Sequence, residues 1–265
     1  MTYLQALILG IFQGVAEFLP ISSSGHLIVL QRVFGMQEPA MTFDIVVHIG
    51  SLVAIIIVFW RDIWELLKNP FSKMTGLLIV GSVPVVVAGF FMRGIMEDNF
   101  RSGLWLACAF TVTGVFLLLA DKITDTPKEE RDITYVDALV VGLFQALALP
   151  PGITRSGTTI MGALSRGINR KAAAKFSFML AIISIAGAGV LETIQVVRSD
   201  YTIGEGTVGL GQYAIGFIAS LVIGYFSIKL LLKLIEACKL KYFSYYVWGL
   251  AALILLDYMV VGRFF

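Results

Sequence analysis

Charged residues are scarce in this chain of 265 residues: 14% are Asp, Glu, Lys or Arg. A soluble globular domain carries about 25%. Hydrophobic residues make up 58% of the chain, and its mean hydropathy is +0.87. These values exclude a disordered chain and an ordinary soluble enzyme. We therefore expect an all-α polytopic membrane protein, with residues 1–265 forming a single membrane domain.

Cysteine and net charge are also low. The two cysteines, Cys108 and Cys238, lie far apart and form no Cys-x-x-Cys pair, which argues against a structural zinc site. We interpret both as free packing thiols. The formal net charge is only +2, so we expect no nucleic-acid partner. The first five residues lack the basic segment of a cleaved signal peptide, so we expect the first apolar segment to stay in the protein.

Six apolar stretches are each long enough to cross a bilayer, which requires about 20 helical residues. Charged or aromatic residues flank them, as is typical of membrane interfaces. The sequence therefore predicts six transmembrane helices, over residues 43–60, 76–92, 102–120, 172–197, 212–235 and 243–261.

A proline and a short polar run interrupt each of two further apolar stretches. Proline removes a helical hydrogen-bond donor and disfavours helix in the residue before it. The resulting pieces are too short to cross a membrane, so we predict two re-entrant helix–loop–helix hairpins. The first comprises residues 3–19, the run Pro20-Ile21-Ser22-Ser23-Ser24-Gly25, and residues 27–34; the second comprises residues 137–149, the run Pro150-Pro151-Gly152-Ile153-Thr154-Arg155-Ser156-Gly157, and residues 158–164.

The two hairpins match each other at an ungapped offset of 132 residues. Both carry Gly-x-Phe-Gln, ending at Gln13 and Gln145, and both carry Ser-Gly, ending at Gly25 and Gly157. This register indicates a duplication, with repeat one over residues 1–120 and repeat two over residues 134–262. Because a hairpin returns to its starting side and three spans end on the opposite side, the two halves form an inverted-topology repeat. Such repeats place sites near the middle of the membrane.

The distribution of positive charge orients this topology. Of the 20 Lys and Arg residues, five lie on the face of the N-terminus, 14 lie on the other face, and Arg155 lies inside. By the positive-inside rule the second face is cytoplasmic. Both termini and the mouth of the first hairpin then face outward.

The two interruptions together suit a phosphate-like group. Each places a Ser-Gly turn just before a short helix, and helix N-termini present unpaired N–H groups that bind anions. Arg155 adds a permanent charge and a bidentate donor. We expect binding roles for Gln13 and for small polar and glycine residues in the two runs and at the start of the piece that follows the second, namely Ser22, Ser24, Gly25, Thr154, Ser156, Gly157, Thr158 and Thr159.

The two copies differ in their ionisable residues. Glu17 matches Leu149 at the offset, Ser23 matches Arg155, and His26 matches Thr158. A charge within the bilayer costs about 2.5–3.5 kcal/mol, so Glu17 and Arg155 require a partner or a task.

A purely structural role remains an alternative for each of these polar residues. In one alternative, Glu17 and Arg155 form an ion pair that only stabilises the fold. In another, His26 only caps a helix. For Ser22 and Ser24 helix capping is the favoured role. We interpret His48, within the first predicted span, as a core histidine.

Two segments resemble the signatures of a known family. The run Gln13-x-x-x-Glu17-Phe18-Leu19-Pro20-Ile21-Ser22-Ser23-Ser24-Gly25-His26 resembles its first signature, E/Q-x-x-x-E followed by Ser-Ser-x-Gly-His. The run from Pro151 to Thr159 resembles its second, P-G-x-S/T-R-S-G-x-T. The family is that of the bacterial undecaprenyl-diphosphate phosphatases, or bacitracin-resistance proteins, and the similarity covers nearly the whole chain. The chain departs from it at residues 181–183, where the family pattern has a proline, which concerns the bend of one span.

The resemblance implies a substrate, a reaction and a location. The substrate is undecaprenyl diphosphate, and the products are undecaprenyl phosphate, a lipid carrier reused in cell-wall synthesis, and inorganic phosphate. The resemblance also implies a divalent cation, Mg²⁺ or Ca²⁺, for which Glu17 and the substrate's phosphates would be ligands. The expected location is the bacterial cytoplasmic (inner) membrane, in contact with its lipid bilayer; a homodimer is left open.

A mechanism can be stated as a hypothesis. Arg155 and the two helix ends bind the diphosphate, and Glu17, with Gln13, holds a cation or orients the neighbouring histidine. His26 acts as general base or as nucleophile, and Ser23 is the favoured nucleophile. Direct attack by water stays open. The alternative function is a transporter or flippase for a lipid phosphate or a small anion, since inverted repeats with broken helices are common in transporters.

Overall fold

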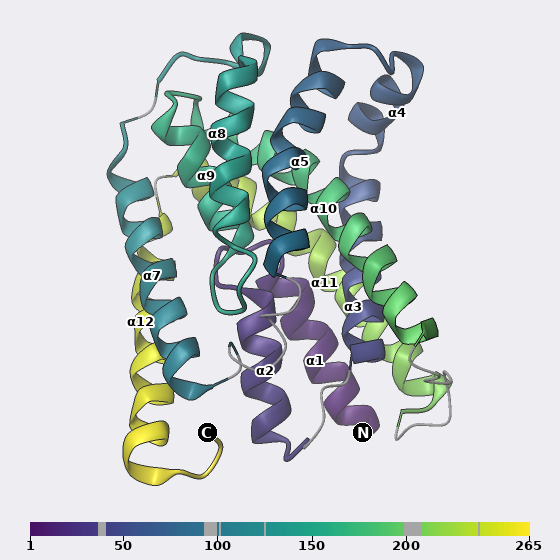
Figure 1. Cartoon of the computed structure of the whole chain (residues 1–265), viewed down its shortest axis with the longest axis vertical. Helices are drawn as coiled ribbons and strands as arrows, with labels where there is room; N and C mark the ends of the chain where they lie inside the picture. The colour runs from purple at the N-terminus through teal and green to yellow at the C-terminus, as the bar shows by residue number, and fades with distance from the viewer. Residues whose placement is uncertain (37–40, 93–99, 101, 125, 199–207, 238) are drawn as a thin grey trace.

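The computed structural model describes residues 1–36, 41–92, 100, 102–124, 126–198, 208–237 and 239–265 (Figure 1). These residues are helical throughout their regular elements and form no strand. Among them, six helices are long and apolar enough to cross a membrane, and they match the six predicted spans in number and place. They are α3 (Met41–Val58), α5 (Lys73–Met92), α7 (Gly103–Lys122), α10 (Arg170–Arg198), α11 (Leu210–Glu236) and α12 (Leu240–Leu256), the last continuing into a π-helical turn, η2 (Asp257–Val261).

Four shorter helices form two pairs, each joined by one of the polar runs. The first pair is α1 (Tyr3–Ala16) and α2 (Ser23–Val33), and the second is α8 (Tyr135–Ala146) and α9 (Arg155–Ser165). In Figure 1 the first pair lies in the lower half of the molecule, near both termini, and the second lies in the upper half. The connections between the paired helices face the middle of the molecule. We call these connections the first break (residues 17–22) and the second break (residues 147–154).

The starts of the four short helices result from local sequence. Thr2 and Thr134 each form a capping box at the start of α1 and α8. Ser22 caps α2 by accepting a hydrogen bond from the Gly25 amide, and Thr154 caps α9 in the same way for Gly157. The expected capping role of Ser22 is therefore confirmed. Ser24 lies inside the first turn of α2 instead, and both Ser-Gly pairs belong to the first turn of a helix rather than to a turn before it.

The first helix of each pair packs against a helix from the opposite half of the chain. Helix α1 lies along α11, and α8 lies along α5. At both contacts two backbones approach so closely that a Cβ at Gly10 would overlap the carbonyl of Gly216, and one at Gly142 would overlap that of Gly81. Both contacts join residues of the first half of the chain to residues of the second. The larger hydrophobic core likewise contains residues of both halves.

The second break is fixed from the side by α7. The indole Nε1 of Trp105 donates to the Pro151 carbonyl (2.9 Å), and Thr113 Oγ1 donates to the Gly152 carbonyl (3.0 Å). Thr113 Oγ1 also accepts from the Thr154 amide (3.1 Å). Irregular backbone inside a membrane protein must find hydrogen-bond partners in the protein itself. These contacts supply them and set the position at which α9 begins.

A fully buried carboxylate ties the start of α8 to the end of α9. Asp137 accepts hydrogen bonds from Lys128 Nζ (2.5 Å), Arg166 Nε (2.9 Å) and Thr134 Oγ1 (2.7 Å). These donors satisfy both carboxylate oxygens, as a buried charge requires. The cluster holds together the end of the second helix pair that lies opposite the second break.

Helix α4 (Trp60–Lys68) was not anticipated from the sequence. It follows α3 directly and has no buried residue, and Trp60, Trp64 and Leu67 are exposed on it. Its Asp62 pairs with Lys175 of α10 (2.5 Å), which also pairs with Glu130 (2.9 Å) in the short helix η1 (Glu130–Asp132). Such a short and amphipathic helix suits the membrane surface.

The structure also bears on two smaller expectations. Helix α10 runs without interruption through residues 181–183, where the sequence lacks the family's proline. Cys108 is a free thiol, but it is exposed on α7 rather than packed inside, because its helix turns that face outward. Cys238 lies outside the described residues.

Candidate active site

In the middle of the molecule, each break touches the start of the second helix of the other pair. A Cβ on Gly25 would lie 2.6 Å from Phe110 Cζ and 3.0 Å from the Cα of Gly152. A Cβ on Gly157 would lie 3.3 Å from Pro20 Cβ and closer still to its own neighbour Thr154. Only glycine allows this approach, so the glycines that we expected to bind substrate instead bring the two helix ends together.

A cavity of about 220 Å³ lies between the breaks. Of the residues expected at the site, Glu17, Ser22, Ser23, Ser24, Thr154 and Arg155 line it. The other sides are formed by helices α3, α5, α8 and α10. The cavity is thus built from both halves of the chain, and it presents hydroxyl groups, one guanidinium and one carboxylate.

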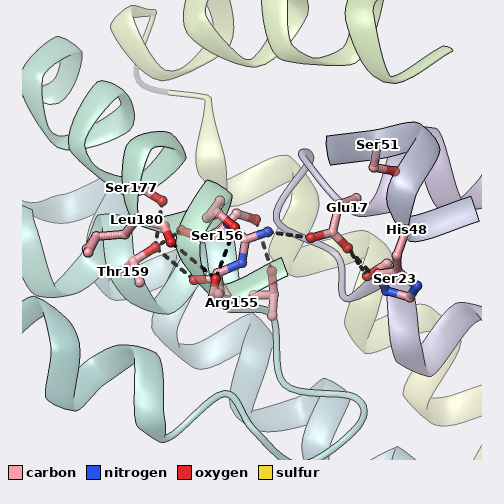
Figure 2. A network of polar contacts seen from close by, with 12 residues as sticks. Glu17, Ser23, His48, Ser51, Arg155, Ser156, Thr159, Ser177 and Leu180 are labelled. Atoms are coloured by element: carbon pink, nitrogen blue, oxygen red, sulfur yellow. Dashed lines mark hydrogen bonds and ion pairs between the residues drawn. The ribbon is translucent and has the colours of Figure 1, made fainter. Parts of the chain in front are cut away.

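An ion pair between the two halves forms the centre of the site. Arg155 Nη2 donates to Glu17 Oε1 (Figure 2), and the Glu17 residue is 8% exposed. Glu17 Oε2 accepts hydrogen bonds from Ser23 Oγ (2.6 Å) and Gln13 Nε2 (3.2 Å). The second terminal nitrogen of the guanidinium, Arg155 Nη1, is buried and has no hydrogen-bond partner. Arg155 therefore keeps one donor for a ligand while it holds Glu17 with the other.

His48 belongs to this cluster, which corrects our interpretation of it as a core histidine. Its Nε2 lies 3.8 Å from Glu17 Oε2, and its Nδ1 donates to the Asp44 carbonyl (2.7 Å). Its side chain is 28% exposed and lines the cavity. The sequence did carry a signal, since an ionisable side chain within a predicted span indicates function more often than packing.

His26 lies behind the cavity wall, in a box of aromatic rings. Its Nδ1 donates to the Ser22 carbonyl (2.8 Å), and the Tyr246 hydroxyl lies 2.9 Å from its Nε2. The residue is 3% exposed, and its ring packs against the rings of Phe12, Phe110 and Tyr246. The structure therefore brings Ser23 together with Glu17, and places His26 with Tyr246. No sequence motif indicated Tyr246, which follows His26 by 220 residues.

His26 supports an unusual backbone at the first break. Ser22 has a φ of +70°, the one positive φ outside glycine among the described residues. Such a conformation costs about 1–3 kcal/mol and persists only where its surroundings hold it. The hydrogen bond from His26 to the Ser22 carbonyl is part of that support, and Ser23 is the next residue.

Ser156, Thr158 and Thr159, in the first turns of α9, do not line the cavity. Thr158 Oγ1 donates to the Thr154 carbonyl (3.0 Å), and Thr159 Oγ1 lies 2.6 Å from Ser177 Oγ of α10. Ser156 Oγ lies 3.2 Å from Thr154 Oγ1. All three are buried, and they hold the first turn of α9, from which Arg155 projects (Figure 2).

The residues fit a cation only together with a phosphate ligand. The described residues contain no group of three or more His, Cys, Asp or Glu side chains able to hold a metal ion. The Glu17 carboxylate is the suitable oxygen ligand on the cavity, whereas Gln13 Oε1 is buried without a hydrogen-bond partner but does not line the cavity. Mg²⁺ and Ca²⁺ prefer oxygen ligands and commonly take several of them from phosphate groups.

Fold and site together define a class of protein: a polytopic helical membrane protein with a buried, Arg- and Ser-containing cavity suited to an anion. The chain belongs to the bacitracin resistance protein BacA family, whose model matches residues 6–253.

Curated relatives cover the whole chain. It is 42% identical, over 264 residues and all of both chains, to an undecaprenyl-diphosphatase of Carboxydothermus hydrogenoformans. It is 41% identical, over 97% of both chains, to undecaprenyl-diphosphatase 3 of Bacillus cereus. It is 37% identical to an undecaprenyl-diphosphatase of Methanosphaera stadtmanae, over 95% of this chain and 97% of that protein.

Proposed function

We propose that this protein hydrolyses undecaprenyl diphosphate to undecaprenyl phosphate and inorganic phosphate, and so returns a lipid carrier to cell-wall synthesis. The names of its relatives support this reaction rather than transport or flipping of a lipid phosphate. The observation that carries the proposal is the cluster of Arg155, Glu17 and Ser23 on the wall of one cavity. It combines an anion-binding donor, a proton acceptor and a hydroxyl.

Arg155 binds the diphosphate through the terminal nitrogen that has no protein partner. Its other terminal nitrogen stays on Glu17, which fixes the plane of the guanidinium. The N-terminus of α9, where Arg155 is the first residue, adds backbone N–H groups and a partial positive charge. Preorganised positive charge is the main contribution that a protein makes to phosphoryl transfer.

Ser23 is the nucleophile in this proposal. Its oxygen forms a bond to the terminal phosphorus, the bridging oxygen leaves with undecaprenyl phosphate, and the Ser23 proton passes to Glu17 Oε2 at 2.6 Å. Water then attacks the phosphoserine and releases inorganic phosphate, and the Ser23 oxygen regains a proton. His26 acts by holding the Ser22 carbonyl, and with it the Ser23 backbone. Glu17, together with phosphate oxygens of the substrate, would hold Mg²⁺ or Ca²⁺, which when bound neutralises charge on the diphosphate.

The isoprenoid tail leaves the cavity sideways between α5 and α10. The lining on that side consists of Val85 from α5 and of Ile185, Ala188 and Gly189 from α10. A Cβ on Gly189 would meet no other atom within 4 Å, so the side of α10 is open there. The small apolar residues give the tail access to lipid without a charged barrier.

The two helix pairs act as re-entrant hairpins of an inverted repeat in the inner membrane, with the site opening outward. The reciprocal packing of α1 on α11 and of α8 on α5 supports this arrangement, since an inverted repeat exchanges equivalent contacts. The excess of Lys and Arg on the face opposite the N-terminus supports an outward mouth. Labelling of single cysteines, placed at Thr2 and at Asn69, with an impermeant thiol reagent in intact cells tests the orientation. Only the first is expected to react.

Release of phosphate by the purified protein in detergent tests the reaction. Wild type is expected to release phosphate from undecaprenyl diphosphate with Mg²⁺ present, whereas Ser23→Ala is expected to lose nearly all activity. Hydrolysis needs no sealed vesicle, while transport does. A wild type that releases no phosphate in detergent but moves lipid phosphate across vesicles would overturn the proposal.

A further inference from the structure

We propose that Gln145 binds the substrate, and that its amide Nε2 donates a hydrogen bond to a phosphate oxygen of the lipid diphosphate beside Arg155. This inference rests on the proposed function, because it names a second contact for the same diphosphate. Nothing in the two sequence signatures pointed to the residue, which lies before the second signature begins.

The position of Gln145 gives it access to the ligand. It lies in the last turn of α8, one residue before the helix ends, and lines the same cavity as Arg155 and Glu17. The residue is nevertheless only 1% exposed, so bulk solvent does not reach its amide.

Both polar atoms of this buried amide lack a partner. Neither Gln145 Nε2 nor Gln145 Oε1 has a hydrogen bond in the structure. Leaving buried polar groups unsatisfied is unfavourable, and an apolar residue of similar size avoids the cost. Glutamine at this position is therefore hard to explain by packing.

The comparison with Gln13 shows what Gln145 lacks. Gln13 holds the matching position in α1, and its Nε2 donates to Glu17, four residues later (3.2 Å). Four residues after Gln145 the chain has Leu149, which offers no acceptor and also lines the cavity. The second amide thus lies in the cavity wall with no carboxylate to bind, and a ligand in the cavity can supply the missing acceptor.

The neighbouring charge identifies the chemistry of that ligand. Arg155 Nη1 is a second buried donor without a partner on this cavity. Phosphate oxygens only accept hydrogen bonds, and one diphosphate offers enough of them for both donors. The Gln145 carbonyl oxygen is then free to accept from water, which the hydrolysis consumes.

Kinetics of Gln145→Leu test the inference in detergent, with farnesyl or undecaprenyl diphosphate and Mg²⁺. Loss of one hydrogen bond to a charged group predicts a kcat/KM about 10- to 100-fold below wild type. A higher KM is expected to carry much of that loss. The melting temperature should stay equal or rise, because an unsatisfied amide has been removed.

The matched control is Ser244→Ala, since Ser244 in α12 is also buried and its hydroxyl has no partner, yet it does not line the cavity. Its kcat/KM should equal that of wild type.

Binding separates this inference from the proposed function. A methylene-bridged, non-hydrolysable farnesyl bisphosphonate should raise the melting temperature of wild type and of Ser244→Ala, and clearly less that of Gln145→Leu. An active wild type with an equally active and equally stabilised Gln145→Leu overturns the role of Gln145 and leaves the reaction intact. A parallel fall of activity and melting temperature in Gln145→Leu also overturns it, in favour of a structural role. An inactive wild type overturns the proposed function, whereas the bisphosphonate arm still decides whether Gln145 contacts a diphosphate.

Discussion

The imidazole of His26 lies nearly parallel to the phenol ring of Tyr246, with ring centroids 5.7 Å apart and the hydroxyl 2.9 Å from Nε2. Because Nδ1 donates to the Ser22 carbonyl, Nε2 of the neutral ring accepts from the hydroxyl. Helix α12, near the end of the chain, therefore helps to fix the first break near its beginning.

Tyr246→Phe should weaken that support. The ring remains for stacking, but His26 loses its hydrogen bond, and the expected loss of stability is about 1 kcal/mol. Turnover should fall severalfold, because Ser22 and Ser23 are held less firmly. The measurements are melting temperature and phosphate release in detergent. Tyr245→Phe is the control, since Tyr245 is exposed and has no bond to His26; identical melting temperatures for the two variants would contradict the prediction.

Arg155→Lys should lower turnover on the order of 100-fold, and Arg155→Ala should abolish it. A lysine offers a compact ammonium, which does not reproduce the planar guanidinium that holds Glu17 and a phosphate with separate nitrogens. Phosphate release measures the effect, with Arg131→Lys as a control, because Arg131 is exposed. Near-normal turnover of Arg155→Lys would show that the two-nitrogen clamp is wrong.

Glu17→Gln should reduce turnover on the order of 10³-fold, because the amide is a poor proton acceptor for Ser23. It should also destabilise the protein by about 3–5 kcal/mol, since Arg155 is left as a buried charge without its partner.

The double variant Glu17→Gln with Arg155→Gln separates structural pairing from catalysis. Removing both charges should restore much of the stability but no activity. A double variant that is both stable and active would mean that the ion pair only holds the two halves together. Thermal unfolding and phosphate release on the same samples decide between these outcomes.

His48→Leu should lower turnover about tenfold, because Glu17 loses an imidazole whose Nε2, when the ring is protonated, attracts its carboxylate. His48→Gln keeps an amide in that space and should retain more activity. Both are measured as kcat and KM for the lipid diphosphate. A wild-type rate for His48→Leu would return the residue to a packing role.

Asp137→Asn should act on stability rather than on chemistry. Lys128 and Arg166 would lose their shared carboxylate, at an expected cost of about 3–5 kcal/mol. Turnover of the protein that stays folded at low temperature should remain near wild type, since Asp137 lies outside the cavity. Asp132→Asn, at an exposed position, is the control for melting temperature.

The sequence predicted the spanning helices well because their signal is local. A bilayer demands about 20 apolar residues in succession, and each predicted span lies within a few residues of the helix observed. Helix α4 was not predicted because it has only nine residues and a mixed composition. It also directly follows an apolar run, and Trp60 was assigned to that predicted span. Which helices pack together, such as α1 beside α11, was not predictable from the sequence. That packing depends on close glycine contacts, and the apolar helices resemble one another in composition.

The site was predictable only where its residues lie in the two polar runs. Glu17, Ser23 and Arg155 stood out as polar residues beside helix breaks, and they do meet at the cavity. Thr158 and Thr159 had the same signal, yet they bond to backbone and to Ser177, because one helix turn has both an inward and an outward face. The role of Tyr246 could not be predicted from local sequence, since its partner His26 is 220 positions away.

The separation of Glu17 and Arg155 by 138 residues has a consequence for biosynthesis. At a translation rate of about 5–20 residues per second, the ribosome completes Arg155 on the order of ten seconds after Glu17. Through that interval an acidic group enters the bilayer without the arginine that later pairs with it, which is costly in lipid. A message cut short before codon 155 should therefore yield a product that membrane proteases clear rapidly.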